Sequence, residues 1–294
     1  MTTVTREPVI ACTTHSFGIV PLAAAFRIIR ALDIEYVDLI AATYPQQLTA
    51  DALAADPDGE AERIGNLAAD AGVQLSGCFV GFKERLSSGD PAHRHRIPEL
   101  FAAIGHFARR CGIPHVQTGF GAASSGLAAE EQFAVLVENV RSAHEAVRAE
   151  GAELLVEAQR GALIQSPDDT WRLLRAVPGL RINHDPGQFE CVGFGPETYE
   201  SLYAHTPHIH MRQARPGALQ EKLDLGTIDF RRVVRGLQAA GFDGVWAMEY
   251  VHFARSADCA GVDVVAETVR MRDLIREELA AIAGDAANDR AVAE

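Results

Sequence analysis

Residues 225–250 have the sequence LGTIDFRRVVRGLQAAGFDGVWAMEY and contain one complete helix–strand unit. The amphipathic segment 227–240 predicts a helix, and Gly241 follows it as a stop signal. The apolar run GVWAMEY, residues 244–250, predicts a buried strand. Glu249 places a carboxylate at the carboxyl end of that run. The stretch therefore predicts a helix that leads into a strand with an acidic residue at its end.

The same alternation of short apolar runs and longer amphipathic segments extends back to the N-terminus. Apolar runs separated by helices are typical of a parallel sheet. We therefore expect an α/β fold, a single-domain (β/α)8 TIM barrel. A doubly wound open sheet is the alternative, but no GxGxxG motif follows the first run. The eight predicted strands are VIACTT (9–14), YVDLIAA (36–42), VQLSGCFV (73–80), HVQTGFG (115–121), AELLVEA (152–158), LRINHD (180–185), HIHMR (208–212) and GVWAMEY (244–250).

The chain has 294 residues, a length that suits one barrel domain over residues 1–284 with a polar tail at 285–294. Between the strands, helices are predicted from proline positions, glycine stops and apolar spacing. They are expected at 21–32, at 49–71 with an interruption near Pro57, at 98–111, at 128–149, from Ser166 onward, and at 196–204, 227–240 and 264–283.

The composition excludes several classes of protein. A net charge of −13 disfavours a nucleic-acid partner, because an acidic surface repels phosphates. Five scattered cysteines without a CxxC pair predict reduced thiols. The N-terminus lacks an apolar signal region, and no apolar run approaches the roughly 20 residues of a membrane span. We therefore expect a cytoplasmic protein with no membrane or nucleic-acid partner.

Four polar residues stand at the carboxyl ends of consecutive predicted strands, namely Glu157, Asp185, His210 and Glu249. Because barrel strands end at one face, these side chains are expected to meet there. Oxygen-rich ligands with one imidazole suit Mn²⁺, Mg²⁺ or Co²⁺ better than a thiolate-rich zinc site, and Mn²⁺ is the expected cofactor, with Zn²⁺ as an alternative. Three carboxylates exceed the charge of a dication by one, which leaves one of them basic enough to move protons. Taken singly, each acid could instead cap a helix or pair with an arginine.

Several stretches together resemble the xylose-isomerase-like barrel superfamily, the sugar isomerase and epimerase group that includes ketose 3-epimerases and inosose dehydratases. The stretches are LLVEAQRG (154–161), INHDPGQ (182–188), HIHMRQARPG (208–217) and the opening stretch. The resemblance covers roughly residues 8–283 and is most specific over 152–251. It implies a divalent-metal site whose ligands are Glu157, Asp185, His210 and Glu249.

Two departures from the epimerase pattern bear on the reaction. Ketose 3-epimerases have a substrate-contacting histidine three residues after the strand-six aspartate, and this chain has Gln188 there. The loop that begins Arg212-Gln213-Ala214-Arg215 is similar to that of the metal-binding subunit of bacterial C-glycoside deglycosidases, which cleave 3-oxo-glycosides by elimination. The candidate substrate-binding residues are His15, Gln159, Gln188, Arg212, Gln213 and Arg215. His208 is expected deeper in the barrel, in a structural role.

The leading hypothesis is a metal-dependent isomerase or epimerase acting on a sugar, keto-sugar or cyclic polyol through an enediolate. Glu157 and Glu249 are its candidate proton-transfer pair. The alternatives are a lyase of the same superfamily, namely a dehydratase or 3-oxo-glycoside deglycosidase, a non-catalytic barrel subunit, and a DNA-repair endonuclease, which the acidic charge disfavours. The expected partners are a sugar or glycoside substrate and a second copy of the chain, or a small partner subunit for a deglycosidase.

Overall fold

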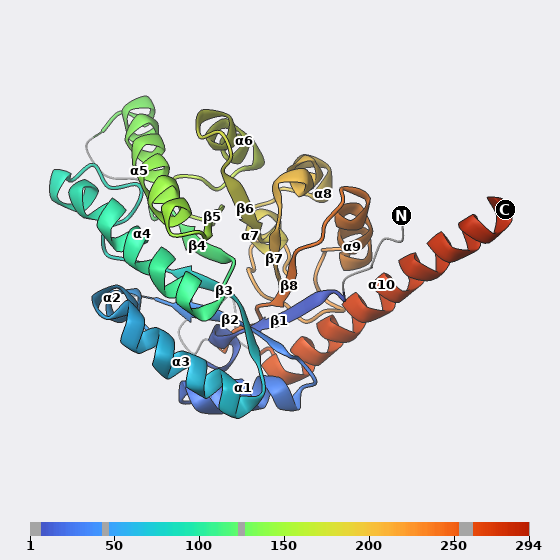
Figure 1. Cartoon of the computed structure of the whole chain (residues 1–294). Coiled ribbons are helices and arrows are strands. Elements are labelled where there is room, and N and C mark those ends of the chain that lie inside the picture. Colours follow the sequence, from blue (N-terminus) through green and yellow to red (C-terminus); the bar gives the residue numbers. More distant parts are fainter. Residues whose placement is uncertain (1–6, 43–46, 123–126, 253–260, 294) are drawn as a thin grey trace.

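The structure is a computed structural model that describes residues 7–42, 47–122, 127–252 and 261–293. Eight parallel strands pair in sequence order, and the eighth pairs with the first, so that the sheet closes (Figure 1). The predicted single (β/α)8 barrel is therefore confirmed. The strands are β1 Val9–Thr13, β2 Tyr36–Ala41, β3 Gln74–Val80, β4 His115–Gly119, β5 Glu153–Glu157, β6 Arg181–His184, β7 His208–Met211 and β8 Val245–Met248.

Helices surround the barrel and follow the strands along the chain (Figure 1). They are α1 Leu22–Ala31, α2 Ala50–Ala55, α3 Pro57–Ala71, α4 Pro91–Cys111, α5 Ala129–Ala149, α6 Pro167–Ala176, α7 Pro186–Cys191, α8 Pro196–Tyr199, α9 Phe230–Ala239 and α10 Val264–Ala293, with the 3-10 helices η1 Thr14–Phe17 and η2 Glu200–His205.

Local sequence signals account for several of these helix ends. The Ser166 hydroxyl accepts a hydrogen bond from Asp169 N (3.1 Å), and Pro167 occupies the first turn of α6, where no N–H is needed. Helix α4 ends at Gly112, whose φ of 68° is left-handed and costs a glycine little. Both ends lie where the sequence predicts them.

Four local features differ from the expectations. Helix α4 begins at Pro91, seven residues before the predicted start, because Asp90 caps Ala92 N (2.9 Å). Thr14, predicted as the last residue of the first strand, instead begins the 3-10 turn η1, which also contains His15. Helix α7 has no counterpart among the predicted helices. Helix α10 continues to Ala293, and its C-terminal part extends beyond the barrel (Figure 1).

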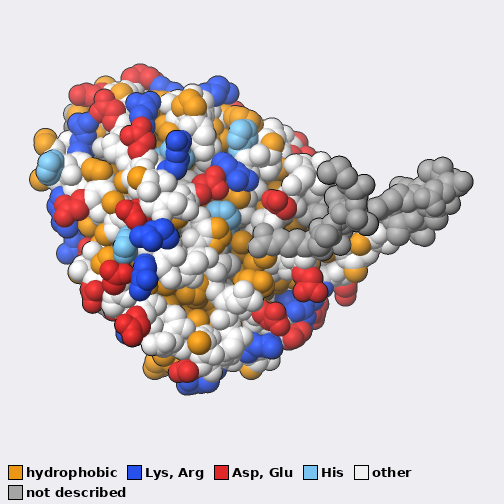
Figure 2. Space-filling view, viewed as in Figure 1, with side chains coloured by type: hydrophobic (Ala, Val, Ile, Leu, Met, Phe, Trp, Pro, Cys, Tyr) orange, Lys and Arg blue, Asp and Glu red, His pale blue; other side chains and the backbone are white. Residues whose placement is uncertain are grey.

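Most of the apolar core forms one large cluster. Its largest fully buried side chains include Trp246, Tyr199, Tyr250 and Phe26. Acidic and basic side chains are interspersed over the face shown in Figure 2. Among the residues that the structure describes, no helix is both long and apolar enough to cross a membrane.

Candidate active site

The four predicted ligand residues stand at the carboxyl ends of β5 to β8. Glu157 is the last residue of β5, and Asp185 directly follows β6 and caps α7. His210 lies within β7, and Glu249 directly follows β8. All four side chains are buried. The carboxyl ends of barrel strands share one face, so the fold brings the four residues to the same pole.

Three of the four residues meet directly. His210 Nδ1 lies 3.0 Å from Glu157 Oε2 and 3.2 Å from Glu249 Oε2, so the two carboxylates flank the ring nitrogen. Carboxylate oxygens and an imidazole nitrogen are suitable ligand atoms for Mn²⁺ and Mg²⁺. Two ligand atoms in adjacent positions around such an ion lie about 3 Å apart. The donor types and the two distances to His210 fit a divalent cation, but the three atoms do not all lie within 4.8 Å of one another, so the two glutamates would have to close on the ion.

Asp185 reaches the trio through Arg212. Its Oδ1 accepts hydrogen bonds from Gly187 N (2.8 Å) and Gln188 N (3.3 Å), as a helix cap does, and its Oδ2 pairs with Arg212 Nη2. The same guanidinium nitrogen lies 3.1 Å from Glu249 Oε2. Three carboxylates and one guanidinium carry a net charge of −2. A single dication would balance that charge. Arg212 therefore compensates the one negative charge that the sequence alone left in excess.

Burial and charge set the ionisation of this cluster. Burial alone would raise the pKa of Glu249, but Arg212 and His210 outweigh it and hold that pKa well below its usual range. Burial, together with the charges of Glu157 and Glu249, raises the pKa of Asp185 to about 6 despite the opposing effect of Arg212. Burial opposes protonation of His210, but the surrounding carboxylates raise its pKa well above the usual value. The site therefore attracts positive charge.

A cavity of about 250 Å³ lies against the cluster and includes Glu157, Glu249 and Arg212 in its wall. Phe79, Ile40 and Leu219 give it an apolar side. A pocket with one apolar side and a few convergent polar groups is the usual form of a small-molecule site. Its full lining is His15, Ile40, Ala42, Phe79, Gly81, Arg85, Glu157, Gln159, Gln188, Arg212, Leu219 and Glu249.

Four of the six predicted substrate-binding residues line this cavity, namely His15, Gln159, Gln188 and Arg212. Gln159 Nε2 donates to Glu157 Oε1 (2.9 Å), and Gln188 Oε1 accepts from Arg160 N (3.1 Å). His15 Nδ1 lies 3.7 Å from Glu249 Oε1.

The other two predicted residues lie outside the cavity. The Gln213 amide bonds to the backbone of its own loop, donating to Ile228 O (2.9 Å) and accepting from Ile228 N (3.0 Å). Arg215 is exposed and pairs with Glu221 (3.0 Å). Their positions favour roles in shaping the loop after β7.

Sequence reasoning missed a buried polar group beneath the site. Asp38, His208 and His210 place candidate ligand atoms within 4.8 Å of one another, as no other trio in the described part of the chain does. Asp38 is fully buried in β2, and its Oδ2 lies 2.9 Å from Nε2 of both histidines. Asn183 donates to Glu157 Oε2 (2.6 Å). The available signal was a lone carboxylate inside the apolar run YVDLIAA, since an unpaired buried acid is rare.

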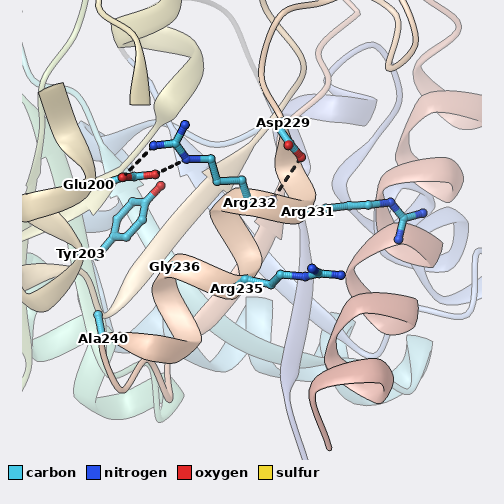
Figure 3. Close-up of a pocket in the computed structure, with 8 residues that line it drawn as sticks. All are labelled: Glu200, Tyr203, Asp229, Arg231, Arg232, Arg235, Gly236 and Ala240. Carbon is cyan, nitrogen blue, oxygen red and sulfur yellow. Dashed lines mark hydrogen bonds and ion pairs between the residues drawn. The ribbon is translucent and has the colours of Figure 1, made fainter. Parts of the chain in front are cut away.

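A larger hollow of about 760 Å³ lies on the outer layer of helices, beside α9 (Figure 3). Arg232 pairs with Glu200 (2.6 Å), whereas Arg231 and Arg235 point the other way and pair with Glu278 on α10. These ion pairs already compensate the charges of the three arginines. The hollow therefore has no uncompensated arginine with which to bind an anion, and the ion pairs hold neighbouring helices together.

Comparison with solved structures shows the same architecture. The D-psicose 3-epimerase of Clostridium cellulolyticum H10, solved with D-tagatose, has a TM-score of 0.73 at 14% identity, over 92% of this chain and 99% of that one. A xylose isomerase-like TIM barrel protein of Mycobacterium smegmatis, in complex with magnesium, has a TM-score of 0.70 at 18% identity, over 93% and 98%. The 3-keto-D-glucoside 4-epimerase YcjR of E. coli has a TM-score of 0.71 at 12% identity, over 91% and 100%.

At these identities the structural likeness establishes the fold alone. No curated protein sequence matches the chain significantly. A model of the xylose isomerase-like TIM barrel family matches residues 26–280, which is most of the chain. The chain belongs to the xylose isomerase-like TIM barrel family.

Proposed function

We propose that this protein is a divalent-metal-dependent enzyme that moves a proton on a sugar, keto-sugar or cyclic polyol. The observation that carries the proposal is the meeting of Glu157 and Glu249, which line a cavity at the carboxyl ends of the strands, with the buried His210 behind them. Membership of a family whose structural relatives include sugar epimerases supports a carbohydrate substrate.

Glu157, Asp185, His210 and Glu249 would hold the metal, with Mn²⁺ as the proposed ion. The Mycobacterium smegmatis relative is in complex with magnesium, which supports a divalent cation as the cofactor. Such an ion polarises a substrate carbonyl and stabilises the negative charge that develops on its oxygen when a neighbouring proton leaves. To join the other three ligands, Asp185 would exchange the contact of Oδ2 with Arg212 for the cation.

The two glutamates would transfer the proton from opposite sides of the substrate carbon. Arg212 and His210 hold the pKa of Glu249 well below its usual range, so Glu249 is present as the carboxylate, which is the form that a general base requires. Glu157 is held in place by hydrogen bonds from Gln159 and Asn183, which fix both of its oxygens. Arg212 keeps a positive charge in the cavity wall, where it would stabilise an enediolate-type oxyanion.

Exchange of carbon-bound hydrogen in heavy water tests this proposal. Metal-free protein reloaded with Mn²⁺ would be incubated with ketohexoses and 3-keto-glucosides, and deuterium incorporation followed by NMR. We expect incorporation beside the carbonyl, and a loss of about 100-fold or more in Glu249→Gln. Glu278→Gln, which alters a buried acid on the outer helices, is the control. Full exchange by the metal-free protein, or by Glu249→Gln, would refute the proposal.

A lyase of the same superfamily is the second candidate, and Gln188 is the observation that favours it. This amide lines the cavity where the epimerase pattern has a histidine, and its Oε1 already accepts a backbone hydrogen bond. An amide does not act as a general acid or base near neutral pH, so a proton transfer that needs the histidine would be lost, whereas elimination from the same enediolate would not. Release of an aglycone from a 3-oxo-glycoside, without epimer, would favour the lyase.

A further inference from the structure

A single carboxylate organises the polar layer beneath the candidate active site. Asp38 is fully buried in β2, and its Oδ2 accepts from Nε2 of His208 and of His210, each at 2.9 Å. Gln117 Nε2, from β4, adds contacts at 3.2 Å to Oδ1 and 3.3 Å to Oδ2. Asp38 thus joins three strands that are far apart in the sequence.

A β-bulge gives Asp38 its place in this layer. The register between β2 and β3 shifts between Val37 and Asp38, so that Val37 pairs with Leu75 but Asp38 pairs with Gly77. The extra residue, Ser76, donates its hydroxyl to Val37 O (3.1 Å). Bulges re-aim side chains and are frequent beside active sites.

Gly77 leaves the space that the carboxylate occupies. A Cβ at this position would lie 2.5 Å from Asp38 Oδ1 and 3.0 Å from His208 Cε1, and closer still to Gln117 Nε2. The bulge and the glycine therefore act together. The bulge pairs Asp38 with Gly77, and the absence of a side chain at Gly77 leaves room for the Asp38 carboxylate.

The contact with Asp38 leaves only one nitrogen of His210 free to face the carboxylates of Glu157 and Glu249. Nε2 bonds to Asp38, and Nδ1 faces Glu157 and Glu249. A metal-binding histidine commonly donates its second N–H to a carboxylate, which fixes the orientation of the ring and raises its basicity. We propose that Asp38 is a positioning residue that presents His210 Nδ1 to the divalent cation of the proposed function.

The same contacts argue against a metal between Asp38, His208 and His210. Nε2 of each histidine already lies at hydrogen-bonding distance from Asp38 Oδ2, and all three side chains are fully buried. None of the three lines the cavity. The group is filled by its own hydrogen bonds, and its role is to hold His210.

The variant Asp38→Asn tests the inference, because it keeps the size of the side chain and removes its charge. Metal-free protein would be titrated with Mn²⁺ by calorimetry. We expect affinity about 10–100-fold weaker than wild type. The matched control is Glu278→Gln, which loses a buried carboxylate bound to Arg231 and Arg235 and should bind Mn²⁺ as wild type does. A purely structural role for Asp38 would lower the unfolding free energy and leave Mn²⁺ affinity unchanged, which would overturn the proposal.

A second measurement separates this inference from the proposed function on which it rests. In metal-free protein with ¹⁵N-labelled histidine, the Nε2 proton of His210 should resonate at low field and move upfield in Asp38→Asn, because a bond to a carboxylate is shorter than one to an amide. If wild type bound no divalent metal, the proposed function would fail, and this shift would still show that Asp38 orients the His210 ring. An identical resonance in both proteins would overturn the role.

Discussion

Replacing Gly77 by alanine adds one methyl group at the centre of the Asp38 layer. The new Cβ would lie 2.5 Å from Asp38 Oδ1, about 0.9 Å inside the 3.4 Å at which ordinary contact begins. Gln117 Nε2 would be closer still. These atoms belong to buried, mutually bonded side chains, so relief requires Gln117 to withdraw from Asp38.

The expected cost follows from those contacts. Losing a hydrogen bond to a charged group costs about 1.5–3 kcal/mol, and overpacking a buried site adds about 1–3 kcal/mol. We therefore expect Gly77→Ala to lower the unfolding free energy by about 2.5–6 kcal/mol. Because Asp38 would shift as well, Mn²⁺ binding should weaken together with stability.

Urea unfolding and Mn²⁺ calorimetry measure the two effects. Gly65→Ala on α3 is the matched control: a Cβ there meets nothing within 4 Å, and alanine in a helix should stabilise by up to about 1 kcal/mol. Gln117→Ala removes the nearest obstacle, so the double variant with Gly77→Ala should cost less than the sum of the single variants. If Gly77→Ala were as stable as Gly65→Ala and bound Mn²⁺ normally, our account of this layer would be wrong.

Two further predictions concern buried charge. Arg212→Met removes the cation between Asp185 and Glu249, and the metal-free protein should lose about 3–5 kcal/mol of unfolding free energy in urea; unchanged stability would contradict the charge balance described above. Burial, with help from His208 and Arg181, lowers the pKa of His115 to about 3, so the native state excludes a proton that the unfolded chain binds below about pH 6.5. Stability is therefore full above pH 6.5 and is lost as the pH falls toward 3, by roughly 2 kcal/mol between pH 7 and pH 5. His115→Gln should reduce the loss measured in urea titrations at the two pH values by roughly 2 kcal/mol and leave the part due to His184, whose pKa burial also lowers to about 3, whereas exposed His95→Gln should lose as much as wild type. Equal losses in all three proteins would refute the assignment.

The barrel was predictable because its signals are local. Eight apolar runs, each bounded by turn residues, correspond to the eight strands within one or two residues at most ends. The exceptions arise where two signals compete. Pro98 suggested a helix start, but Asp90-Pro91 provides the same cap and first-turn proline earlier, and Pro98 lies inside α4. Asp185 also caps α7, a helix too short to show a periodic apolar face.

His208 was expected deep in the barrel, but the rest of the polar layer escaped prediction because its geometry depends on the pairing of distant strands. The sequence shows Asp38 as an interruption of an apolar run, and nothing local reveals that a bulge pairs it with Gly77. The partners His208 and His210 lie 170 and 172 residues further along the chain. Only closure of the barrel brings them together, which is a property of the whole sheet.

Strand alternation, however, carries information about the site that residue types alone do not. Side chains two residues apart on a strand face the same side. His210 and Arg212 are two residues apart, and both contact Glu249. The residue type of Arg212 had suggested only a contact with substrate. Asn183 stands two residues before Asp185 and bonds to Glu157. Asn183 and His208 stand two positions before Asp185 and His210, so strand alternation places them on the same inward side of the barrel. This signal can be read from the sequence, because the alternation of side chains along a strand is as local as its apolar run.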